Sequence, residues 1–263
     1  MRAVWPKLLS AILLLVALAQ CTSADTPSGP AQGKARVQLM TSLPLVWGED
    51  ASMEAILSDR SQPAPIYRYW QEQYDVAAID SLENLAQDDP DVLILAQPRA
   101  LAPADLADLD AWVRSGGAVI ILTDPVLVWP SALPLGDPRR PLASGLLSPL
   151  LGHWGLELVR PAEPGDGDAI LRIGEHRLAT RGAGLFVRTE AGKGAEPNCR
   201  LSDHNLLARC AIGEGQATLV ADADFLDARF WSDDSVAAAG KSAAGRFIDA
   251  LVYTQLKPES RAQ

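Results

Sequence analysis

The sequence predicts an α/β fold with a mostly parallel sheet flanked by helices, and residues 91–124 supply the observations that predict it. Residues 92–95 and 118–122 are continuous apolar runs, which is typical of parallel strands covered on both faces. Between these runs, Pro103 suits a first helical position and the Gly116-Gly117 pair ends the helix. The helix carries one apolar stripe, formed by Leu106, Leu109 and Val113. We therefore expect a right-handed βαβ crossover in this segment.

Composition and charge are those of an ordinary globular protein and argue against nucleic-acid binding. Of the 263 residues, 48% are hydrophobic and 21% are charged, which is sufficient for a core. The formal net charge is −10, whereas binding to a phosphate backbone needs basic patches. We expect a single α/β domain over residues 36–257, a tail over residues 258–263 and no nucleic-acid partner.

The first residues predict export. Arg2 and Lys7 precede an apolar run over residues 8–19, which is too short to span a membrane but suits a signal peptide over residues 1–20. The signal ends in Leu18-Ala19-Gln20-Cys21, which resembles a bacterial lipobox, where the cysteine is lipidated. Ordinary cleavage after Ala19 or Ala24, and an uncleaved anchor, are the alternatives. Residues 21–35 predict a flexible tether, so the expected location is the bacterial periplasm, with a lipid anchor at Cys21.

The first half of the domain alternates strand and helix patterns. A strand is expected over residues 37–40, followed by a loop over residues 41–49 and a short helix over residues 50–57. A second strand is expected at residues 74–79, and a helical turn capped by Ser81 precedes the crossover. Beyond Asp124, five prolines between residues 125 and 141 predict an irregular surface loop, which is either a lid or a docking surface.

The second half changes to shorter segments. Ser148 is expected to cap a short helix before a strand over residues 156–159. Short alternating segments predict an antiparallel β insertion over residues 160–212. A buried strand over residues 217–221 and an amphipathic helix over residues 243–256 complete the domain. The expected architecture is a flavodoxin-like sheet with an antiparallel β extension in the C-terminal half.

Two cysteines in the insertion predict a disulfide. Cys199 and Cys210 are separated by the turn-like stretch Ser202-Asp203-His204-Asn205, so they can face each other across a hairpin. In an oxidising compartment such a pair forms a disulfide bond. Zinc is the weaker alternative, because only His204 is nearby as a third ligand.

Three segments together resemble a known family. They are DVLILAQP with LDAWVRSGGAVIILTDP, then LLGHWGLEL, and then GEGQATLVADADFL with the terminal SAAGRFIDALVYTQL helix. Over residues 37–256 the chain resembles the GldG-type, ABC-transporter-auxiliary domain. This resemblance implies a class I glutamine amidotransferase-like fold without the catalytic residues of the amidotransferases.

Neither a catalytic set nor a metal site is expected. An amidotransferase-like enzyme needs a cysteine on a strand-to-helix elbow with a histidine as base, and the strands that end at residues 95 and 122 lead into other residues. Asp222, Asp224 and Asp227 lack the glycine and the distal glutamate of a calcium loop, so they are interpreted as solvated residues at a strand end. The glycines between residues 182 and 194 are interpreted as hairpin connections. No cofactor is expected.

Candidate binding residues follow from the fold, because α/β proteins bind ligands at the carboxyl ends of their parallel strands. The residues expected at this edge are Ser42, Trp47, Gln97, Arg99, Asp124 and Asp222. Arg99 suits an anion, and Trp47 suits stacking on a ring or sugar.

We therefore expect a non-catalytic cell-envelope protein that is an auxiliary or binding component of a transport or surface-assembly system. Its expected partner is an envelope or membrane protein. Two alternatives are a periplasmic small-ligand-binding protein and a hydrolase that uses acidic residues at the strand ends. Clustered polar side chains in a deep pocket would favour the hydrolase, whereas a pocket without them would favour a binding protein.

Overall fold

The computed structural model describes residues 33–49, 53–58, 60–161, 168–189, 197–231 and 235–256. The chain divides into two units, Met1–Gly33 and Lys34–Gln263. The expected signal peptide, the lipidation site Cys21, most of the tether and the tail lie outside the described residues. The α/β domain lies within the second unit.

A seven-stranded sheet forms the centre of the domain, with the order β2-β1-β3-β4-β11-β10-β9. The strands β2, β1, β3, β4 and β11 are mutually parallel, and β10 and β9 are antiparallel to their neighbours. Their bounds are Asp75–Ala78 for β2, Arg36–Thr41 for β1, Val92–Ala96 for β3, Ala118–Leu122 for β4, Gly215–Val220 for β11, Leu207–Ile212 for β10 and Asn198–Ser202 for β9. The prediction of a mixed α/β fold with a mostly parallel sheet is therefore confirmed. Its flavodoxin-like detail stays a prediction.

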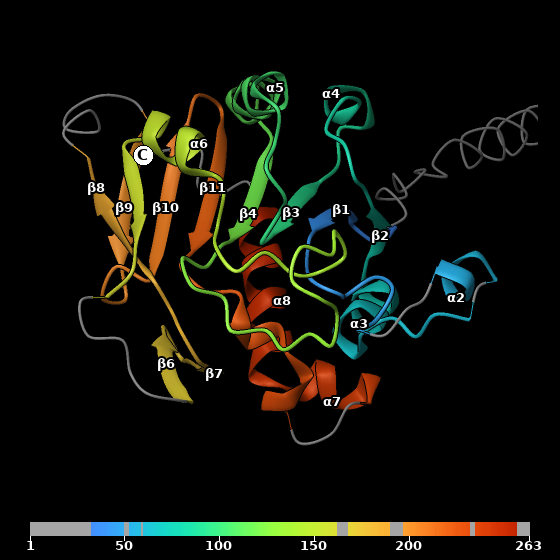
Figure 1. The fold of residues 1–263 in the computed structure, drawn as a ribbon. Coiled ribbons are helices and arrows are strands. Elements are labelled where there is room, and N and C mark those ends of the chain that lie inside the picture. Colours follow the sequence, from blue (N-terminus) through green and yellow to red (C-terminus); the bar gives the residue numbers. More distant parts are fainter. Residues whose placement is uncertain are drawn as a thin grey trace, which may run out of the picture. The chain divides into compact units, whose positions relative to one another are not determined.

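Helices cover both faces of the sheet (Figure 1). One core contains Ile94 and Ile120 and is covered by α3 (Pro65–Gln73), α7 (Val236–Lys241) and α8 (Ala243–Leu256). The other contains Leu93 and Val119 and is covered by α4 (Leu85–Asp88), α5 (Pro103–Arg114) and α6 (Ser148–His153). Successive strand residues point to opposite faces, so the continuous apolar runs of β3 and β4 contribute side chains to both cores. The predicted βαβ crossover is β3-α5-β4.

Two helices were not predicted. The helix α3 occupies residues that the sequence assigns to no helix, and Ile66, Tyr67 and Trp70 are its buried side. Pro65 at its start fixes a helical φ angle, which favours this conformation. The short helix α7 begins after Ser235, whose hydroxyl accepts a hydrogen bond from the Ala238 N–H. The short helix α2 (Met53–Leu57) agrees with its prediction.

The caps predicted for two short helices differ in detail. The prediction that Ser148 caps α6 was wrong, because Ser148 lies within the helix, the preceding residue Leu147 takes the N-cap position, and no side-chain hydrogen bond caps the helix there. Ser81 accepts a hydrogen bond from the Glu83 N–H in the turn before α4, four residues ahead of the helix itself. Pro149 lies in the first turn of α6, which its fixed φ angle suits.

The antiparallel strands between β5 and β10 divide among three sheets where one insertion was expected. The strands β5 (Leu156–Val159) and β8 (Leu185–Arg188) make one two-stranded sheet, and β6 (Ala169–Ile173) and β7 (His176–Thr180) make another. The β9-β10 hairpin instead joins the edge of the main sheet. Cys199 and Cys210 lie directly opposite each other in that hairpin and form the predicted disulfide bond.

The proline-rich loop, residues 125–141, passes across the carboxyl ends of the parallel strands (Figure 1). The Leu127 N–H donates to the Ala143 carbonyl at 2.9 Å, and the Gly145 N–H donates to the Asp124 carbonyl at 2.7 Å, so these contacts tie the two arms of the loop together. Among the helices that the structure describes, none is long and apolar enough to cross a membrane.

Candidate functional site

Backbone and side-chain hydrogen bonds tie the carboxyl ends of β1, β3 and β4 to the proline-rich loop. The Ser42 hydroxyl donates to the Gln97 carbonyl at 2.6 Å and accepts from the Leu142 N–H at 3.3 Å. The Gln97 side chain donates to the carbonyls of Asp124 and Leu142, and it accepts from the Asp124 N–H at 2.8 Å. Gln97 is buried, and its positive φ angle of 45° directs the chain out of β3 at this point. Ser42 and Gln97 therefore fix the positions of these strand ends and of the loop segment at Leu142.

A cavity of about 610 Å³ opens beside this network. Its first wall is the loop after β1, which includes Ser42, Trp47 and Glu49. Arg99, from the segment after β3, lies at its side, and residues 130–141 of the proline-rich loop form the opposite wall. The strands β1 and β3 are neighbours whose connections leave in opposite directions along the sheet, and such switch points are where open α/β sheets bind ligands. The volume is within the range of small-molecule sites.

Some charged side chains at the cavity have hydrogen-bond or ion-pair partners, and Arg99 does not among the described residues. Arg139 binds Asp137 through its guanidinium at 2.8 Å, and the hydrogen bonds from Arg139 hold the pKa of Asp137 down at about 2. Glu49 accepts a hydrogen bond from the Trp129 indole at 3.1 Å. Arg99 is exposed and makes no hydrogen bond or ion pair with the residues that the structure describes. The Trp47 side chain is 50% exposed. A free guanidinium and an accessible indole therefore face the same cavity.

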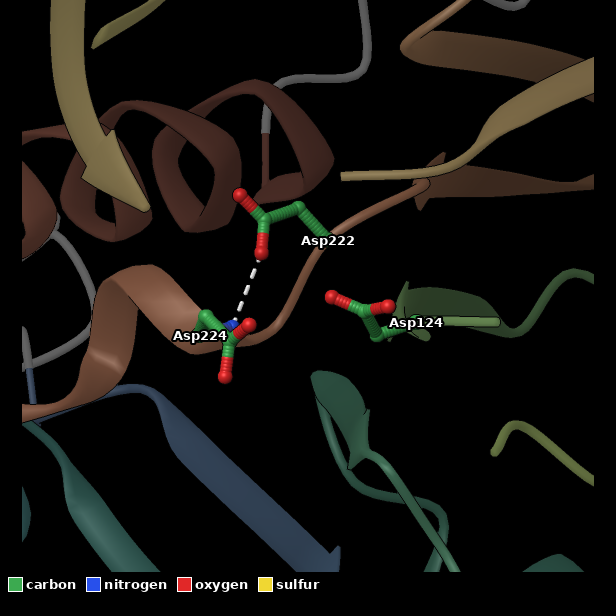
Figure 2. Close-up of side chains that lie close together, drawn as sticks. All are labelled: Asp124, Asp222 and Asp224. Carbon is green, nitrogen blue, oxygen red and sulfur yellow. Dashed lines mark hydrogen bonds between the residues drawn. The ribbon is translucent and has the colours of Figure 1, made fainter. Parts of the chain in front are cut away.

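A second group of polar side chains lies where β4 and β11 end. Asp124 follows β4, and Asp222 and Asp224 follow β11, its parallel neighbour. One carboxylate oxygen from each residue lies within 4.8 Å of the others (Figure 2). The three residues are 0%, 0% and 1% exposed, respectively. Oxygen ligands in this arrangement are the type that a hard cation prefers.

The hydrogen bonds to these carboxylates come from backbone N–H groups. Asp124 accepts from the Val126 N–H at 2.7 Å, and Asp222 accepts from the Asp224 N–H at 2.8 Å. Both oxygens of Asp224 lie 3.1 Å from the Val128 N–H. The cluster therefore holds the first residues of the proline-rich loop in place.

Burial is the largest cause of the raised pKa values in the cluster. It raises the pKa of Asp124, and the negative charge of Asp222 raises it further. It also raises the pKa of Asp222, against the opposing effect of the Thr180 hydroxyl. For Asp224, burial raises the pKa to about 6, although the hydrogen bond from Val128 opposes the change. Three neighbouring carboxyl groups in so dry a site must take up protons or bind a cation.

The six predicted binding residues thus lie in three different places. Ser42, Trp47 and Arg99 line the cavity. Gln97 does not line the cavity, and its side chain instead links the segments that follow β3 and β4. Asp124 and Asp222 belong to the buried cluster. Sequence reasoning placed all six at one edge of the sheet, but it could not separate the sites, because the course of the proline-rich loop decides which strand ends stay accessible.

The interpretation of the aspartates after β11 as solvated was wrong. Asp222, Asp224 and Asp227 are all buried, because the chain turns there into the short 3-10 helix η2 (Asp224–Leu226), which packs into the core. Asp227 does not join the cluster and binds Arg229 instead. The missing partner was Asp124, and the available signal was that each of two buried strands ends in an aspartate.

Fold and cavity define the chain as an α/β protein with a small-molecule-sized cavity at the carboxyl ends of its parallel strands. A family model described as an ABC-type uncharacterized transport system matches residues 34–160. This match supports the ABC-transporter-auxiliary part of the resemblance, while the glutamine amidotransferase-like part stays a prediction. No curated protein matches the chain.

Solved structures with a related arrangement include proteins of differing description. The beta-galactosidase from Rahnella sp. R3 is 14% identical with a TM-score of 0.46, over 86% of this chain and 32% of that one. The mmIFT52 N-terminal domain is 10% identical with a TM-score of 0.48, over 84% and 97% of the two chains. Cytoplasmic Protein STM1381 from Salmonella typhimurium LT2 is 12% identical with a TM-score of 0.48, over 84% and 100%.

Proposed function

We propose that this protein is a non-catalytic auxiliary component of an ABC-type transport system, and that it works in the cell envelope. The observation that carries the proposal is the position of the family match. The matched residues, 34–160, include every residue that lines the cavity at β1 and β3. The part of the chain that is similar to a transport family is therefore the part that forms the candidate binding site.

The chemistry of the cavity favours binding. Arg99 offers an unpaired positive charge, and Trp47 offers an aromatic face. Together they suit a small anionic solute with a ring or sugar. The carboxylates needed for the hydrolase alternative are buried in the cluster, where a solvent-borne substrate does not reach them. The acidic strand ends therefore support a structural or ion-binding role in preference to hydrolysis.

The partner that we propose is a membrane subunit of the transport system. The proline-rich loop presents an apolar side chain to solvent, since Leu135 is 89% exposed. Trp129 of the same loop packs against the core, so part of the loop is fixed and part is available for contact. A lipid anchor at Cys21 followed by a tether would hold the domain close to such a subunit.

Affinity capture tests this proposal. The tagged full chain is crosslinked in its bacterial host, captured from solubilised membranes, and its partners are identified by mass spectrometry. We expect subunits of an ABC-type transport system to be enriched. Leu135→Ser should reduce their recovery at least severalfold, because it removes an exposed apolar contact within the matched segment.

The matched control for this capture is Ile170→Ser. Ile170 is 57% exposed but lies in β6, outside the matched segment. It should leave recovery unchanged. The auxiliary role is contradicted when the wild-type chain enriches no transport subunit. If the same chain then binds an anionic solute that Arg99→Ala abolishes, the periplasmic ligand-binding alternative replaces it.

A further inference from the structure

The buried aspartate cluster carries more negative charge than its surroundings balance. Three neutral backbone N–H groups, those of Val126, Val128 and Asp224, donate hydrogen bonds to it. The nearest guanidinium groups have carboxylate partners of their own: Arg181 binds Asp168 at 2.5 Å, and Arg229 binds Asp227. Burying like charges without a counter-charge is costly, so the site is poised to take up a positive ion.

Two carboxylate oxygens of the cluster have no donor. Asp124 Oδ2 and Asp222 Oδ2 are shielded from solvent and accept no hydrogen bond from the residues that the structure describes. A buried acceptor without a partner is uncommon in folded proteins. Each of these residues uses its other oxygen for a backbone N–H, which leaves one oxygen apiece available for a ligand.

An independent observation comes from a different element. Thr180, the last residue of β7, is 1% exposed, and its hydroxyl oxygen is buried without a hydrogen-bond partner of ordinary geometry among the residues that the structure describes. Its hydroxyl lies beside Asp222, and β7 packs against the helix η2 that begins at Asp224. A buried neutral oxygen from a different element is thus directed at the cluster through Asp222.

We propose that Asp124, Asp222 and Asp224 bind one hard divalent cation, Ca²⁺ or Mg²⁺, with the Thr180 hydroxyl as a further oxygen ligand. All four side chains offer oxygen, the donor type of these cations. Histidine and cysteine, which zinc favours, are absent from the group. The cation supplies the positive charge that the described protein groups do not.

The bound cation stabilises one wall of the cavity. Asp124 and Asp224 hold the N–H groups of Val126 and Val128, which begin the proline-rich loop. Residues 130–141 of that loop line the cavity. The cation site does not rest on the proposed transport role, because its ligands are buried and separate from the cavity.

Metal binding to the full chain tests the inference. Protein freed of metal with EDTA is dialysed against CaCl₂ or MgCl₂, and bound ions are counted by native mass spectrometry at neutral pH, with thermal unfolding followed in parallel. We expect one ion per chain, and a higher melting temperature with the cation. Asp222→Asn should abolish both effects, and Thr180→Val should weaken the affinity about tenfold, as loss of one supporting group typically does.

The choice of variants distinguishes a loss of cation binding from a folding defect. Asparagine has nearly the shape of aspartate and removes repulsion within the cluster, so Asp222→Asn should remain folded, which circular dichroism verifies. Asp227→Asn is the matched control, because Asp227 is equally buried but binds Arg229 outside the cluster. It should bind the ion like the wild type. The proposal is overturned when the wild type binds neither cation, when Asp222→Asn still binds one, or when Asp227→Asn loses it as well.

Discussion

At the scale of single residues, two aspartate environments in this chain have opposite consequences. The cluster carboxyls lack cationic partners, whereas Asp110 in α5 has a full set. Asp110 accepts hydrogen bonds from Arg114 Nε at 2.7 Å and from the Trp154 indole at 2.8 Å. Burial alone would raise the pKa of Asp110, but these hydrogen bonds outweigh it and lower the pKa. Aspartate is therefore stabilised as an anion at position 110, whereas in the cluster its negative charge needs a proton or a cation.

Asp110→Asn should lower the free energy of unfolding by about 1–2 kcal/mol at pH 7, because it weakens two charge-assisted hydrogen bonds, one from Arg114 within α5 and one from Trp154 at the end of α6. The folded pKa lies below the unfolded value, so this contribution is present above about pH 4 and is lost as the pH falls through the folded pKa. The difference from the wild type should thus shrink in acid. Urea unfolding at pH 7 and pH 3 measures it.

Asp108→Asn is the control for this prediction. Asp108 lies exposed on the same helix, so its replacement should change stability little at either pH. Equal losses in the two variants, or a loss in Asp110→Asn that persists unchanged at pH 3, would show that the hydrogen bonds of Asp110 do not act as described.

At the scale of elements, the β9-β10 hairpin shows how local pattern and pairing agree. Its register places Cys199 opposite Cys210, and both side chains are buried in the core that α5 and α6 cover. The non-glycine residues Asp203, His204 and Asn205 take positive φ angles in the turn. Asn and Asp tolerate this conformation better than most residues, which suits the turn to the sequence.

Reduction of the disulfide should lower the free energy of unfolding by about 2–3 kcal/mol, because the bond restricts a short loop of the unfolded chain. Thiol counting on the denatured mature chain should find Cys199 and Cys210 blocked until a reductant is added. Denaturant titration with and without reductant measures the loss. A double variant, Cys199→Ala with Cys210→Ala, should show no response to reductant; a similar response there would assign the effect to something other than this bond.

At the scale of the whole molecule, the sequence predicts an export signal ahead of a domain whose residues 34–160 match the model of an ABC-type uncharacterized transport system. The disulfide is consistent with an oxidising compartment. Formal net charge of −10 gives the domain no attraction to anionic lipid surfaces. Membrane association should therefore depend on an anchor.

Metabolic labelling with a palmitate analogue should mark the protein, because Cys21 follows a lipobox-like Leu18-Ala19-Gln20. Cys21→Ser should remove the label and leave export intact, since the apolar run of the signal is unchanged. Fractionation of the host cell verifies the export of both forms. A wild-type chain that is exported without label would mean ordinary signal cleavage, and the anchor would then have to be abandoned.

Features that depend on residues close together in the chain could be predicted from the sequence. The β3-α5-β4 crossover is predicted by two apolar runs, an apolar helical stripe and a Gly-Gly pair that ends the helix, all within about thirty residues. The disulfide hairpin is similarly local. The helix α3 was not predicted, because its few apolar residues run directly into the strand pattern of residues 74–79.

Which strand ends form a site depends on contacts between distant parts of the chain. Asp124 and Asp222 are almost one hundred residues apart in the chain, and they meet because β11 returns to pair with β4. Likewise, the proline-rich loop covers this pair yet leaves a cavity at β1 and β3 beside Arg99. Hydrophobic periodicity specifies the face of an element that is buried, but it does not specify its neighbour in the sheet. Long-range strand order therefore set both the cavity and the aspartate cluster.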